Sequence, residues 1–293
     1  PANLLIVRRS TEELIRKLLA EKDDPRADVV WMVAATGMIR LRTEGLLEPL
    51  AGLYEPEGLA KIEPGWRDPT LPPEWLGLSG WAPVLCVNRN LVPEQERALL
   101  ESGSWDALTD RRFRGQIVMP SPYTSGTGYM VVSGLVQMQA YGEPDAWAYM
   151  DRLHENVAWY TSSGAEPCRL VAAGQVGIGI GANICSSDPR FQGVLLVYPA
   201  PGAGWEMDAV ALVRKDRIDQ GALDFLAWAI GEQAMGEYAT FRPMLAYDGF
   251  QPAQPCIAGL QGGEMIPDRF FWASANLERV IEKWQIRYDS LPR

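Results

Sequence analysis

Three segments of the sequence share one pattern, in which a short apolar run ends in a turn rich in Ser, Thr and Gly and a helical pattern follows. The segments are Ile6–Glu13, Gln116–Tyr129 and Trp159–Pro167. A strand that leads through such a turn into a helix leaves the first backbone N–H groups of that helix without intrahelical partners. These groups point out of the sheet edge and form a seat for an anion. The repetition predicts an α/β chain with several anion seats.

Strand and helix patterns alternate along most of the chain, and this alternation is typical of parallel sheets whose faces are covered by helices. Before the first Pro-rich and Gly-rich stretch at 48–78, we expect strands at 4–8 and 27–33 and helices at 10–22 and from 38 to about 45, the first helix beginning with a capping box of Ser10 and Glu13. After it, we expect strands at 81–88, 113–119, 157–160, 176–181, 194–198 and 208–213, and helices at 126–140, 144–154, 165–173, 217–238 and 272–288.

Two βα stretches joined by two crossings indicate a two-lobed clamshell. Lobe 1 would comprise residues 1–82 plus 200–293, and lobe 2 residues 83–199. The hinge would lie near 80–85 and 199–207. Because ligands of open α/β sheets bind beyond the carboxyl ends of the strands, we expect a solute to bind in the cleft between the lobes.

Charge and composition exclude several classes of function. The chain of 293 residues has 47% hydrophobic residues, 22% charged residues and a net charge of −10. This balance is ordinary for a globular protein with well-buried cores. A nucleic-acid partner would require a basic face, which this chain lacks. No apolar stretch approaches the roughly 20 residues of a membrane-spanning helix.

Cysteine and histidine content argues against a metal centre and against an enzyme. The four cysteines have no CxxC spacing, and the one histidine, His154, lies in a helical surface pattern that indicates a structural role. A Ser-His-Asp or Cys-His arrangement would have to use this single histidine. The chain also lacks a Walker lysine and a nucleophile elbow. We therefore expect neither a cofactor nor catalysis.

Taken in order, the segments of this chain resemble the periplasmic substrate-binding proteins of ABC importers, in the branch that contains ferric-iron, 2-aminoethylphosphonate and sugar-phosphate binders. The matching segments are Ala20–Trp31, Glu44–Pro49, Ser104–Leu108, Arg114–Pro120, Thr124–Tyr129, Leu170–Ile178 and Trp272–Tyr288. The resemblance implies a type II periplasmic-binding-protein fold with two mixed sheets flanked by helices. It also implies a monomer that binds a small anionic or zwitterionic solute in the periplasm and delivers it to an ABC permease.

The resemblance has one departure at the start of the chain. Family members begin with a further strand and helix, and Leu4–Arg9 resembles their second strand, so we expect the opening βα unit to be absent here. The sequence begins at Pro1 with neither Met nor a signal-like apolar segment, which indicates a processed or trimmed product.

By motif, the resemblance places the ligand at the turn that follows each strand. The hydroxyl and backbone N–H donors would come from Thr124, Ser125, Gly126 and Thr127, from Ser162, Ser163 and Gly164, and from Ser10, Thr11, Ala35 and Thr36. Any single Ser or Thr among them is better explained as a helix cap. Three such turns on one sheet edge favour an anion site.

The segment Trp205–Asp208 lies where the chain crosses back. A carboxylate facing the ligand cannot help to hold a phosphate, so Glu206 and Asp208 would bind an ammonium group or sugar hydroxyls, unless they are solvated edge residues. The ring of Trp205, or that of Trp31, could stack on a cation or a pyranose. These residues favour a zwitterionic or polyhydroxyl organophosphorus solute, such as 2-aminoethylphosphonate or a sugar phosphate.

Two other functions stay open at this point. A ferric-iron site would use tyrosinates, and Tyr123, Tyr129, Tyr160 and Tyr198 are available, although the sequence has no adjacent Tyr-Tyr pair. An enzyme that acts on a phosphorylated small molecule is the second alternative.

A disulfide is a further hypothesis. Cys168 opens a helix and Cys185 follows the next strand, so a right-handed βαβ arrangement would bring both to one sheet edge. An oxidising periplasm would permit a bond between them.

Overall fold

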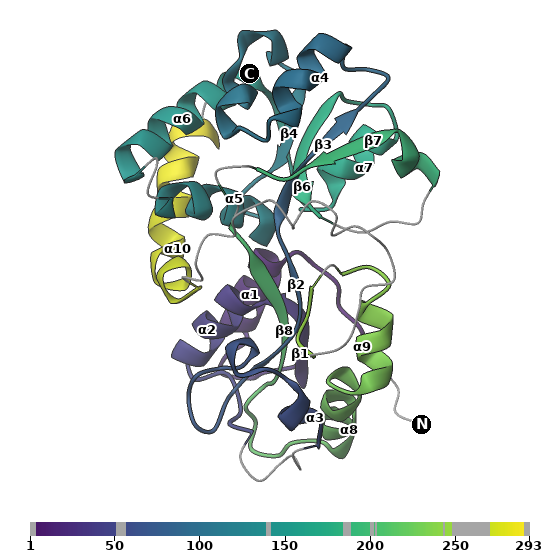
Figure 1. The fold of residues 1–293 in the computed structure, drawn as a ribbon. Coiled ribbons are helices and arrows are strands. Elements are labelled where there is room, and N and C mark those ends of the chain that lie inside the picture. The colour runs from purple at the N-terminus through teal and green to yellow at the C-terminus, as the bar shows by residue number, and fades with distance from the viewer. Residues whose placement is uncertain are drawn as a thin grey trace. The chain divides into compact units, whose positions relative to one another are not determined.

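The computed structural model describes residues 4–50, 57–138, 142–183, 189–199, 202, 204–242, 244–247 and 270–289. The chain divides into two compact units (Figure 1). The first unit contains the described residues of Pro1–Trp81, Glu206–Pro255 and Phe270–Ala275, and the second contains those of Ala82–Trp205 and Asn276–Arg293. Each unit has one sheet flanked by helices, so the expected α/β fold with two sheets is confirmed.

The sheet of the first unit has the strand order β1-β8-β2-β9. Its strands are β1 (Val29–Ala34), β8 (Glu206–Leu212), β2 (Leu76–Trp81) and β9 (Met244–Leu245). Neighbouring strands all run antiparallel, because the returning β8 lies between β1 and β2, which run parallel to each other. The alternation of strands and helices predicted parallel neighbours, and it could not show this insertion.

Helices cover the sheet of the first unit on both sides. Figure 1 shows α1 (Thr11–Ala20) and α2 (Ala35–Thr43) on one side and α8 (Gln220–Ala229) and α9 (Glu232–Tyr238) on the other. All seven residues of β8 are consequently buried. The short helix α3 (Glu57–Lys61) and a 3-10 turn at Pro64–Trp66 lie in the region expected to be irregular.

The expected strand at 4–8 is wrong. Residues 4–10 form no strand, and the side chain of Leu5 is 93% exposed. A strand exists only where its N–H and C=O groups pair with a neighbour, and no described strand pairs with this segment. The expected capping box is also wrong, since Ser10 occupies the N-cap position of α1 but its side chain makes no capping hydrogen bond.

The sheet of the second unit is mixed, with the strand order β5-β4-β6-β3-β7. The strands are β3 (Pro83–Asn88), β4 (Ile117–Pro120), β5 (Val157–Thr161), β6 (Ile178–Ala182) and β7 (Val194–Val197). β4 runs parallel to β5 and β6, whereas β3 runs antiparallel to β6 and β7. The parallel pairs bring the carboxyl ends of three strands to one edge of the sheet.

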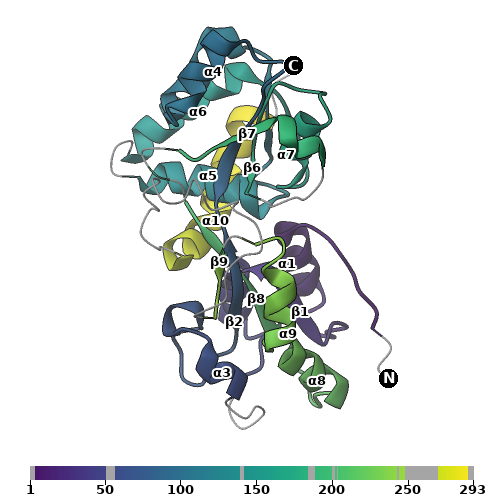
Figure 2. The same cartoon turned by 45° about the vertical axis from the view of Figure 1, so that its right-hand side comes forward.

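The helices of the second unit are α4 (Glu94–Glu101), α5 (Gly126–Gln137), α6 (Gly142–Asn156) and α7 (Glu166–Ala172), with the later part of α10 (Phe270–Trp284). Both views show α7 against β6 (Figures 1 and 2). Among the described residues, no helix has the length and apolar character needed to cross a membrane.

The C-terminal segment differs from the expected lobe boundaries, which placed residues 200–293 in lobe 1. From Asn276 onward, the described residues belong to the second unit. Arg279 pairs with Glu143 of α6 at 2.6 Å, and Arg287 pairs with Asp151 at 2.8 Å. These partners are far apart in the sequence, so helical periodicity alone could not assign the segment. The units also divide at 81/82 and 205/206, where the sequence suggested 82/83 and 199/200.

Candidate functional site

The turn between β4 and α5 presents buried hydroxyl groups at a helix N-terminus. Ser125 is the N-cap of α5, and its Oγ accepts a hydrogen bond from the backbone N–H of Gly128 at 3.4 Å. Ser125 and Thr127 are both buried. Gly126 and Thr127 supply the first N–H groups of α5, which have no intrahelical partners. The buried Oγ1 of Thr124 has no hydrogen-bond partner among the described residues.

A glycine is required where this turn closes on the end of β4. A Cβ atom added to Gly128 would lie 2.5 Å from the carbonyl oxygen of Pro120, closer than real Cβ contacts. The helix can therefore begin directly over the strand end only with glycine at this position.

The second expected turn of this unit, Ser162–Gly164, lies against the first. A Cβ atom on Gly164 would lie 1.9 Å from Thr127 Oγ1 and 3.2 Å from Ser125 Oγ. The turns meet because they follow the parallel neighbours β4 and β5, and the backbone N–H of Ser121 donates to the Thr161 carbonyl at 2.9 Å. Hydroxyl groups, backbone N–H groups and the N-terminus of α5 thus gather at one edge, an arrangement suited to an anion.

In the first unit, the expected segments also come together. A Cβ atom on Gly37 would lie 3.3 Å from Thr11 Cγ2, so the start of α1 contacts the start of α2. Thr36 follows Ala35 in α2, and its Oγ1 donates to Glu206 Oε2 at 2.6 Å. Thr36 and Glu206 are both buried. This cluster contains hydroxyl groups and a carboxyl group, and it therefore differs chemically from the donor-rich edge of the second unit.

The carboxyl group of Glu206 has an unusual protonation equilibrium. Burial raises the pKa of Glu206 from 4.5 to about 8, although hydrogen bonds from Thr36 and from the backbone N–H of Met207 lower it. A carboxyl group with this pKa is mostly protonated at neutral pH. It can then both donate and accept a hydrogen bond, as the hydroxyl groups of a sugar require.

Asp208 lies in a network of side chains within the first unit. Its Oδ2 accepts from Ser79 Oγ at 3.1 Å and pairs with Arg242 at 2.6 Å, and its Oδ1 accepts from Trp81 Nε1 at 3.2 Å. Burial raises the pKa of Asp208, while Arg242 lowers it. Both oxygens are engaged inside the unit, which favours a structural role over contact with a solute. Since Glu206 and Asp208 are buried, the alternative that they are solvated edge residues is wrong.

The tryptophans proposed for stacking differ in their surroundings. Trp31 packs against Phe225, Trp228 and Tyr238, and its Nε1 donates to Tyr238 Oη at 2.9 Å. These contacts with α8 and α9 favour a packing role for Trp31. Trp205 is half-buried at the end of the second unit, directly before Glu206.

Two of the four tyrosines available for ferric iron, Tyr129 and Tyr160, are engaged in packing. Tyr129 is buried in α5, and Tyr160 contacts the rings of His154 and Trp284. His154 Nδ1 lies 2.9 Å from Tyr160 Oη, in agreement with the structural role expected for this histidine. Among the described residues, no group of three or more His, Cys, Asp or Glu side chains could hold a metal ion.

Sequence patterns missed some of the polar groups around these segments. Arg242 and Ser79 carry no motif, and only the fold brings them to Asp208. Asn183 could have been found, because it directly follows the strand 178–182 at the same edge as the two turns. Its side chain accepts from the backbone N–H of Ala82 at 2.8 Å.

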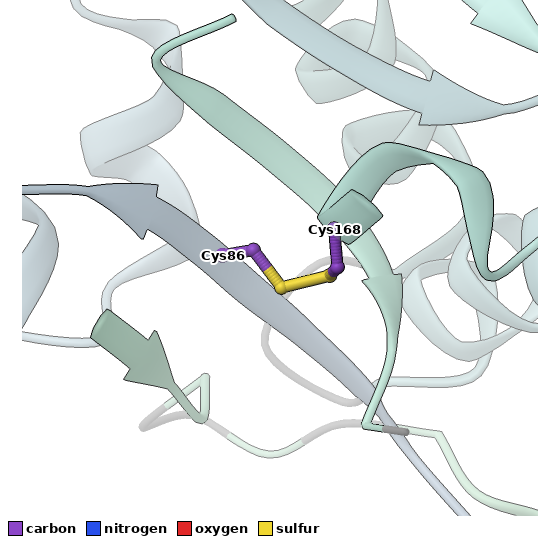
Figure 3. Close-up of a disulfide and its surroundings, with 2 residues drawn as sticks. All are labelled: Cys86 and Cys168. Carbon is purple, nitrogen blue, oxygen red and sulfur yellow. A yellow bond between two sulfur atoms is a disulfide. The ribbon is translucent and has the colours of Figure 1, made fainter. Parts of the chain in front are cut away.

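The disulfide expected between Cys168 and Cys185 is wrong. Cys168 is bonded to Cys86, with a Cα–Cα distance of 5.4 Å, and Cys185 lies outside the described residues. Figure 3 shows the bond between β3 and α7. The sequence places Cys185 nearer along the chain, but β3 lies beside β6 in the sheet, so Cys86 is the neighbour of α7 in space.

The chain is similar in sequence and in fold to known solute-binding proteins. A family model described as bacterial extracellular solute-binding protein matches residues 5–247. An uncharacterized protein of Haemophilus influenzae is 28% identical over 230 residues, which are 78% of this chain and 65% of that protein. A "probable ABC transporter periplasmic-binding protein" of Sinorhizobium fredii is 28% identical over 149 residues, which are 48% of this chain and 38% of its own length.

Solved structures with the same fold include two periplasmic binding proteins and a ferric ion-binding protein. AfuA from Actinobacillus pleuropneumoniae, with exogenous fructose-6-phosphate bound, has a TM-score of 0.81 at 24% identity, over 97% of this chain and 90% of AfuA. The periplasmic binding protein P5PA has a TM-score of 0.77 at 22% identity, over 96% of this chain and 90% of P5PA. The apo ferric ion-binding protein A of Pasteurella haemolytica has a TM-score of 0.73 at 16% identity, over 96% of this chain and 89% of that protein.

Proposed function

The chain belongs to the family of bacterial extracellular solute-binding proteins, and we propose that it captures a small organophosphorus solute and delivers it to an ABC permease. The observation that carries this proposal is the contact between the two turns of the second unit, where Gly164 lies against Thr127 and Ser125. The turns combine hydroxyl donors with the N-terminus of a helix of 12 residues. A phosphate or phosphonate group is the ligand that such donors suit best.

Thr36 and Glu206 of the first unit favour a sugar phosphate over 2-aminoethylphosphonate. A mostly protonated Glu206 offers little negative charge to an ammonium group, whereas it can exchange hydrogen bonds with sugar hydroxyls. AfuA, which has the same fold, binds fructose-6-phosphate. We therefore propose a phosphorylated sugar as the solute class, with Ser125 and Thr127 of the second unit at the phosphate.

Binding without covalent chemistry is part of this proposal, as is a periplasmic location. A buried disulfide suits an oxidising compartment, where such bonds persist. The family consists of solute-binding proteins, and an ABC permease is the partner that we propose for a monomer of this chain.

The experiment that tests the function is a panel of solutes measured by thermal shift and calorimetry. We expect fructose 6-phosphate to stabilise the protein most, ahead of 2-aminoethylphosphonate and inorganic phosphate, and ferric citrate to have no effect. Iron binding is the second candidate function, because the chain shares its fold with ferric ion-binding protein A. A visible colour that chelators bleach, together with stabilisation by ferric citrate alone, would favour it. Release of inorganic phosphate from fructose 6-phosphate would instead indicate an enzyme.

A further inference from the structure

The position of the turn Ser162–Gly164 depends on the short helix α7 that follows it. The helix after it, α7, has only seven residues, and helices this short have no stability of their own in water. α7 must therefore be fixed by its contacts with the rest of the second unit. Since the turn leads directly into α7, whatever fixes the helix also fixes the turn.

Part of the fixation comes from β6, which has glycines at alternate positions under α7. A Cβ atom on Gly179 would lie 3.0 Å from the carbonyl oxygen of Pro167, and one on Gly181 would lie 2.9 Å from Cys168 Sγ and 3.1 Å from the Gly164 carbonyl oxygen. The Gly164 carbonyl accepts a hydrogen bond from the backbone N–H of Ala182 at 3.1 Å. The helix and the turn thus rest on the strand without intervening side chains.

The disulfide adds a covalent link at the same place. It joins Cys168, four residues after Gly164, to Cys86 in β3, which pairs with Gly179 in the neighbouring strand. Figure 3 shows the bond running from Cys168 of α7 to Cys86 of β3. Both cysteines are buried. The bond therefore fixes the first turn of α7 against the centre of the sheet.

We propose that the Cys86–Cys168 disulfide is a positioning element of the solute site, which holds the turn Ser162–Gly164 against Thr127. This inference rests on the proposed function, in which both turns contact the phosphate. Gly164 has no free space toward Thr127, so movement of α7 changes the spacing of the two donor sets. Without the bond, α7 keeps its contacts with β6 but loses its fixed distance from the sheet. The donors are then less well ordered before the solute binds, and affinity falls because binding must order them.

The test compares wild-type protein with Cys86→Ala/Cys168→Ala, and with Val176→Ala as a control from the same apolar cluster. We measure calorimetric affinity for fructose 6-phosphate and for inorganic phosphate, together with hydrogen exchange of the amides at 162–165. The double variant should bind both solutes about tenfold more weakly, because binding must then order the turn 162–164. The amides at 162–165 should also exchange faster in this variant. The control should lose stability but keep its affinity.

Several outcomes overturn the proposal. Affinity of the double variant within about twofold of wild type, which is well below the 1.4 kcal/mol of a tenfold change, would overturn it. If the variant does not fold, the wild type is compared with and without a phosphine reductant. Unfolding on reduction would also overturn the proposal, since the bond would then be a requirement of the fold. If the wild type binds no organophosphate, the proposed function fails by itself, and unchanged exchange at 162–165 on reduction then overturns the positioning role.

Discussion

At the scale of single residues, Ser125 and Thr127 supply the hydroxyl groups of the proposed anion site. Replacing both by Ala removes two hydroxyl donors, and a hydrogen bond to a charged group contributes about 1.5–3 kcal/mol. We expect the double variant to bind fructose 6-phosphate at least about tenfold more weakly in calorimetry, a change of about 1.4 kcal/mol. Ser133→Ala is the matched control, because Ser133 is buried in the same helix and its Oγ lies 3.4 Å from the Met130 carbonyl. Equal affinity of the double variant and the control would refute the site.

Glu206 should make stability depend on pH. Its folded pKa of about 8 lies above its ordinary value of 4.5, so its favourable contribution is complete below pH 4.5 and is lost as the pH rises to 8. Glu206→Gln keeps a polar group beside Thr36 but does not titrate. We therefore expect wild type to lose stability relative to Glu206→Gln between about pH 5 and about pH 8, by more than about 1 kcal/mol.

Urea unfolding at both pH values measures this difference. Glu12, whose pKa burial raises to about 7, titrates in both proteins, so its contribution cancels in the comparison. Parallel pH profiles of the two proteins would show that Glu206 is ionised in the folded state.

The half-buried Arg242 pairs with the buried carboxylate of Asp208, and removal of this cation should be costly. Arg242→Met leaves the Asp208 carboxylate buried without its cation, and breaking a buried pair in this way costs about 3–5 kcal/mol. Lys61→Met is the control, since Lys61 pairs with Glu232 at the surface, where little change is expected. Urea unfolding checks both variants. A loss in Arg242→Met no larger than in the control would mean that Asp208 is solvated or protonated without its partner.

At the scale of elements, Gly164 joins β5 and α7 to the start of α5. Gly164→Ala would place a Cβ atom 1.9 Å from Thr127 Oγ1, so one of the two turns must move. We expect a loss of about 1–3 kcal/mol in stability, the usual cost of overpacking, and weaker binding of fructose 6-phosphate. Gly193→Ala is the control in the same unit, where the nearest atom would lie 3.8 Å away. Thermal unfolding and calorimetry that gave equal results for the two variants would contradict the close contact.

The contact between the two turns could be predicted from the sequence, because both follow strands of a βα pattern and parallel strands end at one edge. The pairing of Cys168 could not, since it depends on the order of strands in the sheet. The segment Leu4–Arg8 has the composition of a strand, yet composition does not supply the neighbour that a strand needs. The position of Arg279 against Glu143 likewise depends on a contact between distant parts of the chain.

On the scale of the whole molecule, the two units of the chain have separate sheets and offer chemically different polar groups. The second unit supplies hydroxyl and N–H donors at a mixed sheet, and the first supplies a carboxyl group of raised pKa beside Thr36. The donors of the second unit suit an anionic group and the protonated carboxyl group of Glu206 suits hydroxyl groups, and a sugar phosphate carries both kinds of group. This combination is the reason for preferring a sugar phosphate over inorganic phosphate.

The net charge of the chain should affect the rate at which the solute associates. The chain has a net charge of −10, which repels a dianionic sugar phosphate at long range, whereas the helix N-terminus attracts it only within about one turn. Salt screens the long-range repulsion, because the Debye length falls from about 30 Å at 0.01 M to about 10 Å at 0.1 M. We expect the association rate constant of fructose 6-phosphate to rise with salt over this range and the dissociation rate constant to change little. Stopped-flow tryptophan fluorescence measures both, with 2-aminoethylphosphonate, a less negative solute, as the comparison. An association rate that falls with salt would mean that a local positive field outweighs the charge of the whole molecule.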